Sequence, residues 1–290
     1  MIRLLPTLPT TRHPTQMPED SPPLRVTMLG TGTSTGVPVL GCSCSVCTSS
    51  DPRDKRLRCA CYIEAGPLGI LVDAGPDFRQ QAQRAGIRRI DAVCFTHHHF
   101  DHTAGIDDLR PFFYQNRRLM PCFANSNTVQ KLKKRYSYIF GDTPYPGAAR
   151  VQLKAVDEAF TVQSRYDDGS SLHIQPVPLW HGDTPTMGIR IGAFAYLTDA
   201  SAIPESSFDL LDGVEVLVLD ALRPDPHPTH FSFDEGVRVA NRIGAQDTYF
   251  IHMTHAVRHA EQTAALPDHV HLAYDGLELK VPAPSESCTA

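Results

Sequence analysis

The stretch CFTHHHFDHTAGIDD, residues 94–108, follows an apolar run and carries four histidines within six residues: His97, His98, His99 and His102. Residues two apart in an extended segment point to one side, so His97 and His99 can bind one ion. Asp101 and His102 follow where the chain must turn, and they can face a second ion. Imidazole and carboxylate together suit zinc, manganese or iron. A lone histidine after a strand is usually an ordinary loop residue, but the H-x-H-x-D-H spacing favours a metal site.

Alternating apolar and polar residues around this stretch predict a strand-rich chain. We expect strands over residues 24–32, 61–75 (two strands joined at Gly66-Pro67), 90–97, 171–181, 187–199, 214–220 and 247–252, and a hairpin over 269–281 that turns on Asp275-Gly276. Helices are expected over residues 77–86, 124–141 (capped near Ser126) and 232–245 (an S-x-x-E start at Ser232). Each half is strand-rich with a few helices, which predicts two sheets packed face to face with helices outside.

Length and composition exclude several classes of protein. A chain of 290 residues can bury a full core, and no low-complexity linker divides it, so we predict a flexible Pro-rich tail over residues 1–23 and a single domain over residues 24–290. The net charge of −5 argues against nucleic-acid binding through bulk charge, although a local metal site can still attract a small anion. No segment is long and apolar enough for a membrane span or a signal peptide. We therefore expect a cytoplasmic protein with reduced cysteines and no membrane partner.

The segment GCSCSVC places Cys42, Cys44 and Cys47 within six residues. Three thiolates at this spacing require only one more ligand for tetrahedral zinc, whereas the alternative is three unpaired buried thiols in a loop. The other cysteines lack such spacing, and we predict packing or surface positions for Cys59, Cys61, Cys94, Cys122 and Cys288.

The segment THHHFDHTAG resembles the signature of the metallo-β-lactamase superfamily. Further pieces of that pattern follow strands in the expected order: LVDAG, LWHGD, YLTDAS and FIHMTH. The resemblance covers residues 24–281 and implies an α+β four-layered αββα sandwich with a two-metal site on one edge. It also implies the ligands: one metal held by His97, His99 and His181, the other by Asp101, His102 and His252, with Asp199 bridging and Asp73 orienting a ligand. His98 takes no role, and we predict ordinary positions for His173, His227, His259, His269 and His271.

The stretch GTGTSTGVPVLGCSCSVC, with FIHMTH much later, is similar to the PhnP-like phosphodiesterase branch of that superfamily. The resemblance implies a structural zinc held by the three cysteines and His255. The superfamily member of pyrroloquinoline quinone biosynthesis has the same trio but an incomplete metal motif. This chain has every ligand position, which favours an active hydrolase.

Two divalent metals (manganese, zinc or iron) suit phosphodiester hydrolysis, because they activate water and offset charge on the phosphate. We predict a small phosphate ester as the substrate, either linear or cyclic. Asp101 and His230 are the predicted catalytic residues, with His230 as the general acid or a phosphate contact. The alternative for His230 is an ordinary surface histidine. Three alternative functions stay open: a tRNase Z-like nuclease, a lactone or thioester hydrolase, and a non-catalytic binding protein. A nuclease of that type has a flexible arm that grips tRNA, and residues 141–150 are the only candidate for it but form a short segment. The resemblance also implies a homodimer.

Overall fold

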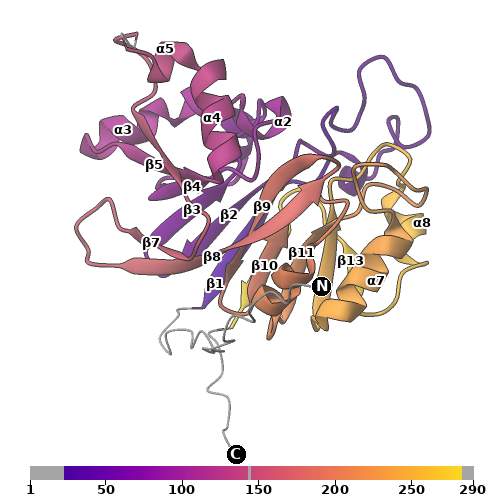
Figure 1. The fold of residues 1–290 in the computed structure, drawn as a ribbon. Helices are drawn as coiled ribbons and strands as arrows, with labels where there is room; N and C mark the ends of the chain where they lie inside the picture. The colour runs from indigo at the N-terminus through magenta and orange to yellow at the C-terminus, as the bar shows by residue number, and fades with distance from the viewer. Residues whose placement is uncertain (1–22, 143–144, 283–290) are drawn as a thin grey trace, which may run out of the picture.

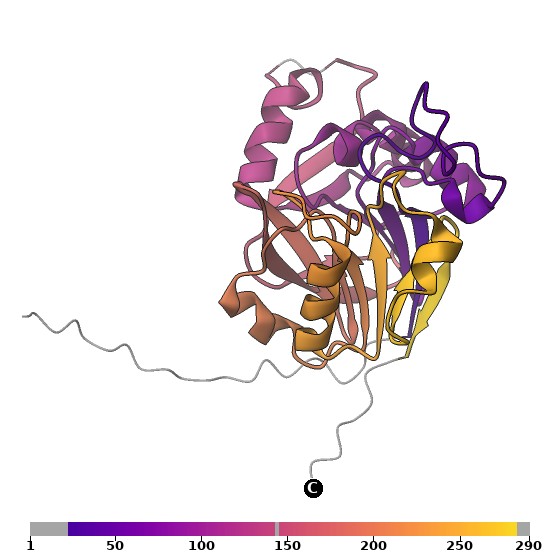
Figure 2. The same cartoon turned by 90° about the vertical axis from the view of Figure 1, so that its right-hand side faces the viewer.

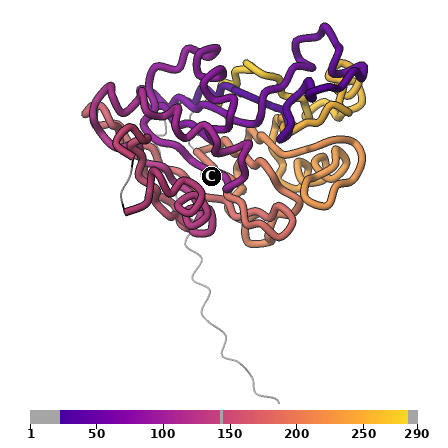
Figure 3. Tube along the Cα trace, turned by 90° about the horizontal axis from the view of Figure 1, so that it is seen from above, coloured from indigo at the N-terminus to yellow at the C-terminus, as the bar shows by residue number. Residues whose placement is uncertain are grey.

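The computed structural model describes residues 23–142 and 145–282, which form two seven-stranded sheets packed face to face with helices on their outer faces (Figure 1). The predicted αββα sandwich is confirmed. Seen along the sheets, the N-terminal and C-terminal halves lie on opposite sides of the molecule, and the last segment returns beside the first (Figure 3). The predicted tail and Cys288 lie outside the described residues, apart from Pro23.

The first sheet holds the N-terminal strands and the last strand of the chain. Its order is β14-β1-β2-β3-β4-β5-β6, and its strands are β1 (Leu24–Gly30), β2 (Ala60–Ala65), β3 (Leu68–Val72), β4 (Ala92–Cys94), β5 (Met120–Ala124), β6 (Val151–Ala155) and β14 (Glu278–Val281). The strands from β14 to β3 pair antiparallel, and those from β3 to β6 pair parallel. The turn at Gly66-Pro67 is confirmed, but β4 is shorter than the strand predicted over residues 90–97.

The second sheet repeats this arrangement with the order β13-β12-β11-β10-β9-β8-β7. Its strands are β7 (Phe160–Gln163), β8 (Ser171–His181), β9 (Thr184–Ile191), β10 (Phe194–Leu197), β11 (Val216–Asp220), β12 (Asp247–Ile251) and β13 (Val270–Leu272). Antiparallel pairing runs from β7 to β10 and parallel pairing from β10 to β13. The parallel strands of both sheets therefore end at shared edges, where side chains from distant parts of the chain can meet.

Helices cover the outer faces: α1 (Phe78–Arg84), α2 (Phe100–Thr103), α3 (Arg110–Asn116), α4 (Ser126–Arg135), α5 (Ser137–Phe140), α6 (Glu205–Phe208), α7 (Phe233–Ile243) and α8 (His259–Thr263), with short 3-10 turns η1 (Pro52–Asp54), η2 (Ile106–Leu109) and η3 (Asp209–Leu211). Figure 2 shows α7 lying outside the second sheet. Its predicted capping box is confirmed, since Ser232 and Glu235 exchange hydrogen bonds. The cap of α4 is Asn125 rather than Ser126, and Tyr136 separates α4 from α5. Within the described residues, no helix combines the length and apolar character that crossing a bilayer requires.

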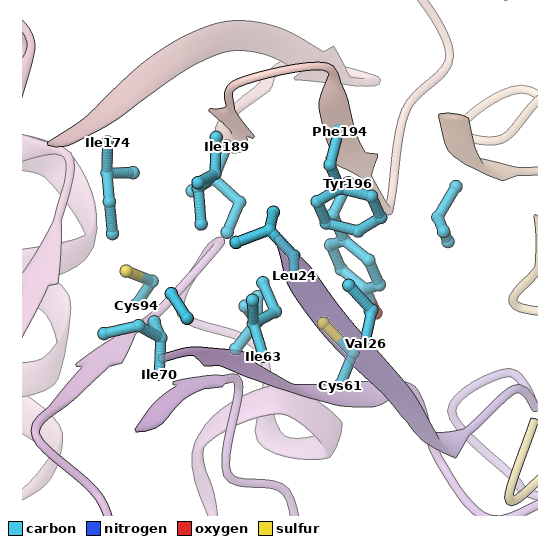
Figure 4. Close-up of a cluster of buried hydrophobic side chains, with 14 of the residues drawn as sticks. Leu24, Val26, Cys61, Ile63, Ile70, Cys94, Ile174, Ile189, Phe194 and Tyr196 are labelled. Atoms are coloured by element: carbon cyan, nitrogen blue, oxygen red, sulfur yellow. The ribbon is translucent and has the colours of Figure 1, made fainter. Parts of the chain in front are cut away.

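The main core lies between the two sheets, where apolar side chains of both inner faces interdigitate (Figure 4). Strand β3 is buried along its whole length because helices cover its outer face as well. The cysteines at positions 59, 61, 94 and 122 are buried, as expected for packing residues.

The hairpin predicted over residues 269–281 is wrong. Strand β13 pairs parallel with β12 in the second sheet, whereas β14 pairs antiparallel with β1 in the first. The Asp275-Gly276 turn crosses between the sheets, and the Asp275 carboxylate accepts hydrogen bonds from the backbone N–H groups of Thr31 and Leu57 at 2.9 and 2.8 Å. Asp-Gly sets a tight turn, but it does not decide which strands pair afterwards.

Candidate metal centre

Three histidines from two strand ends converge on one point of the sheet edge. His97 and His99 follow β4, and His181 is the last residue of β8. One ring nitrogen of each lies within 4.8 Å of the others. The ring centroids of His97 and His99 are 4.4 Å apart, and those of His99 and His181 are 5.3 Å apart. The structure thus brings together the three side chains predicted to share one metal.

A second group adjoins the first and consists of buried residues: Asp101, His102, Asp199 and His252. Asp199 lies between the two groups. Its Oδ1 is 3.9 Å from His97 Nε2 and 3.3 Å from His252 Nε2, and its Oδ2 is 3.1 Å from His102 Nε2. A carboxylate at this position can offer one oxygen to each of two ions, as the predicted bridging role requires.

The chemistry of this donor set fits divalent cations. The Nε2 atoms of His97, His102 and His252 are buried and form no hydrogen bond, although an Asp199 oxygen lies 3.9, 3.1 and 3.3 Å from them, respectively. Burial lowers the pKa of His97 and keeps its ring neutral, which is the form that binds metal. Burial would raise the pKa of Asp199, but the surrounding histidines lower it well below its ordinary value, so the carboxylate is ionised. Unpartnered imidazole nitrogens around an ionised carboxylate are what zinc, manganese or iron would bind.

Asp73 orients one of these histidines, as predicted. It accepts hydrogen bonds from the Thr96 backbone N–H and hydroxyl, both at 2.8 Å, and from His102 Nδ1 at 2.7 Å. The bond to Nδ1 leaves Nε2 of His102 as the atom that faces the centre. Asp73, Asp199 and His252 all have left-handed backbone conformations, with φ of 63°, 52° and 64°. Such strain costs of order 1–3 kcal/mol per residue and is typical of functional sites.

The segment after β3 passes very close to α2. A Cβ added to Gly75 would lie 1.9 Å from the carbonyl oxygen of Asp101, so only glycine allows this approach. The backbone N–H of Ala74 also donates to the carbonyl of His102 at 2.9 Å. This contact fixes the helix that carries Asp101 and His102.

We expect Gly75→Ala to destabilise the protein by about 3 kcal/mol, because backbone must move to admit the methyl group. Urea unfolding with an unchanged m-value measures the loss. Gly86→Ala is the control: its φ is left-handed, at 63°, unlike that of Gly75, but its Cβ meets nothing within 4 Å, so it carries backbone strain without a clash. It should cost only about 1 kcal/mol. Equal losses in the two variants would contradict the close-packing argument.

His230 reaches the centre, and an aspartate absent from the sequence prediction holds it there. The His230 ring centroid lies 4.5 Å from that of His181 and 4.6 Å from that of His252. Its Nδ1 lies 3.0 Å from Asp220 Oδ2, which also accepts from the Ala200 backbone N–H. Burial opposes a charge on His230, but the Asp220 carboxylate raises the pKa of His230 to about 9. Asp220 is the last residue of β11, and this position at a strand end is the sequence signal that could have identified it as a site residue.

The three clustered cysteines lie beside His255 at a separate site, on the loop between β1 and β2. The distances from His255 Nδ1 to the Sγ atoms of Cys42, Cys44 and Cys47 are 3.4, 3.5 and 3.6 Å. The backbone N–H of Cys47 donates to Cys44 Sγ and lowers the pKa of that thiol to about 6, which favours the thiolate. Four soft donors around one point suit tetrahedral zinc. Three unpaired thiols would not explain why His255, which is 208 residues after Cys47 in the sequence, lies against them.

The five histidines predicted to hold ordinary positions lie outside the metal-ligand groups described above. His173, His269 and His271 lie on the strands of the second sheet or beside them, and His271 Nε2 lies 2.9 Å from Asp247. His259 is buried beside Asp54, which accepts from its backbone N–H. His227 lies nearest the centre, with its ring 5.3 Å from that of His230.

Comparisons with known proteins agree with this geometry. The sequence profile described as "Beta-lactamase superfamily domain" matches residues 69–253. A crystal structure described as a new diphosphatase from the PhnP family is 41% identical, covers 89% of this chain and 97% of its own, and has a TM-score of 0.80. Zinc-bound PqqB from Methylobacterium extorquens covers 88% of this chain and 99% of its own, with a TM-score of 0.68, and at 20% identity it shows the fold alone.

One curated relative is named for a different reaction. A Porphyromonas gingivalis protein named octanoyltransferase is 39% identical over 259 residues, which is 88% of this chain. The chain spans about half the length of that protein, 51%, and the name applies to the whole of it.

Proposed function

This chain belongs to the beta-lactamase superfamily, and we propose that it is a hydrolase that cleaves a phosphodiester or diphosphate bond in a small molecule. The observation that carries the proposal is the pair of ligand groups that share Asp199, beside a histidine placed to donate a proton. The similarity to a PhnP-family diphosphatase supports the same reaction class. The homodimer, the cytoplasmic location and the single-domain boundaries stay predictions.

In this proposal His97, His99 and His181 hold one divalent ion, and Asp101, His102 and His252 hold the other, with Asp199 between them. When bound, two such ions act as Lewis acids toward the phosphoryl oxygens and activate the attacking water. Zinc, manganese and iron all suit these ligands. The cysteine trio and His255 would hold a further zinc, which would stabilise the loop between β1 and β2.

His230 is the proposed general acid. Asp220 fixes Nδ1, which leaves Nε2 of the ring to donate to a leaving oxygen, and the raised pKa keeps the ring protonated at neutral pH. Because the ring stacks on that of His252 and its centroid lies 4.5 Å from that of His181, the proton would be delivered at the edge of the metal centre.

We expect His230→Gln to lower kcat about 100-fold for an alkyl ester such as the methyl ester of thymidine 5′-phosphate. For a p-nitrophenyl ester the loss should be much smaller, because p-nitrophenolate leaves without a proton. Asp220→Asn should show the same dependence on the leaving group, since it removes the group that orients the ring. Equal losses for both esters would contradict the acid role, and metal analysis of each variant checks that the centre is intact.

The first test of the reaction class is hydrolysis of bis(p-nitrophenyl) phosphate by protein loaded with manganese or zinc. Turnover supports a phosphodiesterase. If protein that holds two catalytic metals hydrolyses neither this diester nor a diphosphate such as ADP, the proposal fails, and lactones and thioesters become the substrates to test on this scaffold.

A further inference from the structure

Arg56 is one of the largest side chains that the described chain buries completely, and it is charged. It lies on the loop between β1 and β2, which also carries the three clustered cysteines. Its Nη2 is 3.4 Å from Asp54 Oδ1, and both side chains are at most 1% exposed. Its Nε has no hydrogen-bond partner among the described residues. A buried ion pair with an unpartnered donor adds little to folding stability, because removing the two charges from water costs about as much as their attraction returns. Stability alone therefore does not explain Arg56.

The guanidinium of Arg56 contacts a segment that carries one ligand of each metal site. Its Nη1 donates to the carbonyl of Thr254 at 3.5 Å. Thr254 lies between His252, which faces the metal centre, and His255, which faces the cysteines. The Asp54 carboxylate accepts a hydrogen bond at 2.8 Å from the first backbone N–H of α8, a few residues further along. Arg56 and its partner Asp54 thus contact residues 252–259 at two points.

The end of β1 holds the same segment from another side. The backbone N–H of Met253 donates to the carbonyl of Thr31 at 3.0 Å, and the carbonyl of Met253 accepts from the N–H of Thr33 at 3.1 Å. Between these two residues, a Cβ added to Gly32 would lie 2.9 Å from both Cβ and the carbonyl oxygen of Arg56. Glycine in the GTG sequence therefore allows Arg56 to pack against this turn and to reach residue 254.

His252 depends on such support because its backbone is strained. Its φ is 64°, in the left-handed region, and a residue other than glycine stays there only where the surrounding structure fixes it. In this conformation His252 Nε2 lies 3.3 Å from Asp199 Oδ1. If the contacts of residues 253 and 254 were lost, the backbone could relax and turn the imidazole away from the metal centre.

Arg56 is also tied to the cysteine loop through its backbone. Its N–H donates to the carbonyl of Val37 at 2.7 Å, and its carbonyl accepts from the N–H of Val37 at 2.8 Å. Val37 belongs to a small buried apolar cluster with Val46 and Cys47. Figure 2 shows this loop beside the segment that leads into α8. A change at the cysteines can therefore reach Arg56 through Val37.

We propose that Arg56 is a positioning residue of the metal centre: its guanidinium holds the backbone between His252 and His255, so that the placement of His252 depends on the cysteine loop. The inference rests on the proposed function and adds a coupling between the two metal sites through one side chain. Zinc bound by the cysteines and His255 would then raise the affinity of the metal centre for its ions, and by linkage the reverse holds.

The double variant Asp54→Asn/Arg56→Met tests the positioning role. It removes both buried charges, and asparagine still accepts from the N–H of α8. We expect the manganese affinity of the metal centre, measured by competition with a chelator, to fall about tenfold. Manganese is the probe because thiolates prefer zinc. For bis(p-nitrophenyl) phosphate kcat should fall with KM nearly unchanged. Asp51→Asn/Arg53→Met is the matched control: this ion pair is on the same turn but is partly exposed, and its loss should change neither quantity.

A merely structural role of Arg56 has a different signature. It would lower Tm but leave unchanged the manganese affinity of the folded protein, measured well below Tm, and that result would overturn the inference. If the double variant does not fold, Arg56→Lys takes its place. Lysine keeps the charge beside Asp54 but lacks the planar fork that also reaches the Thr254 carbonyl, so the affinity should again fall.

A double-mutant cycle with Cys47→Ala tests the coupling. Cys47→Ala should lower the manganese affinity of the metal centre in the wild-type background, and it should have little further effect in Asp54→Asn/Arg56→Met. Losses that simply add would refute transmission through Arg56. The cycle also separates this inference from the proposed function, because metal affinities are measured without substrate. A protein that binds manganese but hydrolyses no phosphate ester would contradict the proposed function and still give a complete cycle.

Discussion

Asp199→Asn is expected to lower kcat/KM for bis(p-nitrophenyl) phosphate by at least about 1000-fold. Among the described residues, Asp199 is the carboxylate whose oxygens face both ligand groups, at 3.9 Å from His97 and 3.1 Å from His102. Asparagine removes the charge but tolerates the left-handed backbone at this position, where φ is 52°. The loss should therefore come from the centre and not from misfolding. Circular dichroism and metal analysis of the variant measure fold and ion content alongside the kinetics.

Asp183→Ala is the matched control for this prediction. Asp183 lies two residues from His181, in the turn before β9, but it is exposed. An exposed carboxylate beside the site contributes only weakly to the electrostatic potential at the metal centre, so activity should stay within about twofold of wild type. A wild-type rate in Asp199→Asn, or an equal loss in Asp183→Ala, would remove Asp199 from the centre of the mechanism.

Cys47→Ala is expected to lower Tm by about 10 °C and to release one equivalent of zinc. A structural zinc contributes several kcal/mol to folding, and each kcal/mol shifts Tm by about 2–4 °C in a protein of this size. Cys47 is the buried member of the trio, and its Sγ lies 3.6 Å from His255 Nδ1. Thermal unfolding and metal analysis check the prediction.

Ser45→Ala separates the zinc site from the loop itself. Ser45 lies between Cys44 and Cys47 and is exposed, so its loss should leave both Tm and zinc content unchanged. Activity should fall in Cys47→Ala as well, because His255 follows the metal-centre residue His252 by three positions. A Cys47→Ala protein that retains all its zinc would contradict the site.

Local patterns predicted most of the site because each candidate ligand follows a strand end. His97, Asp199 and His252 all come just after strands that end at the same edge, so their meeting could be anticipated once two sheets were expected. Asp220 has the same kind of position but no histidine or repeated motif beside it. Its role depends on His230, which is 10 residues later in the sequence and whose Nδ1 lies 3.0 Å from the Asp220 carboxylate. Pairing between side chains of different loops is a tertiary property, and spacing does not reveal it.

The fold was predicted less completely than the site. Alternation located β2 and β3, but it gave no signal for β5 to β7 or for α3. Strand β5 is almost wholly buried, β6 has no buried residue, and β7 and α3 have one each, so none of them alternates. The error at Asp275-Gly276 has a different origin. Turn residues specify local geometry, whereas the choice between two sheets depends on which edge is free when the chain arrives.

The pairing of β14 with β1 has a consequence for synthesis. Leu24 is paired with Val281, so β1 acquires one of its two neighbours only when β14, more than 200 residues later, has been translated. Contacts this distant in sequence close slowly, and until then the edge of β1 is open to wrong partners. A nascent chain halted before residue 278 therefore exposes an unpaired edge strand. We expect such chains to depend on chaperones until β14 has emerged and completes the first sheet.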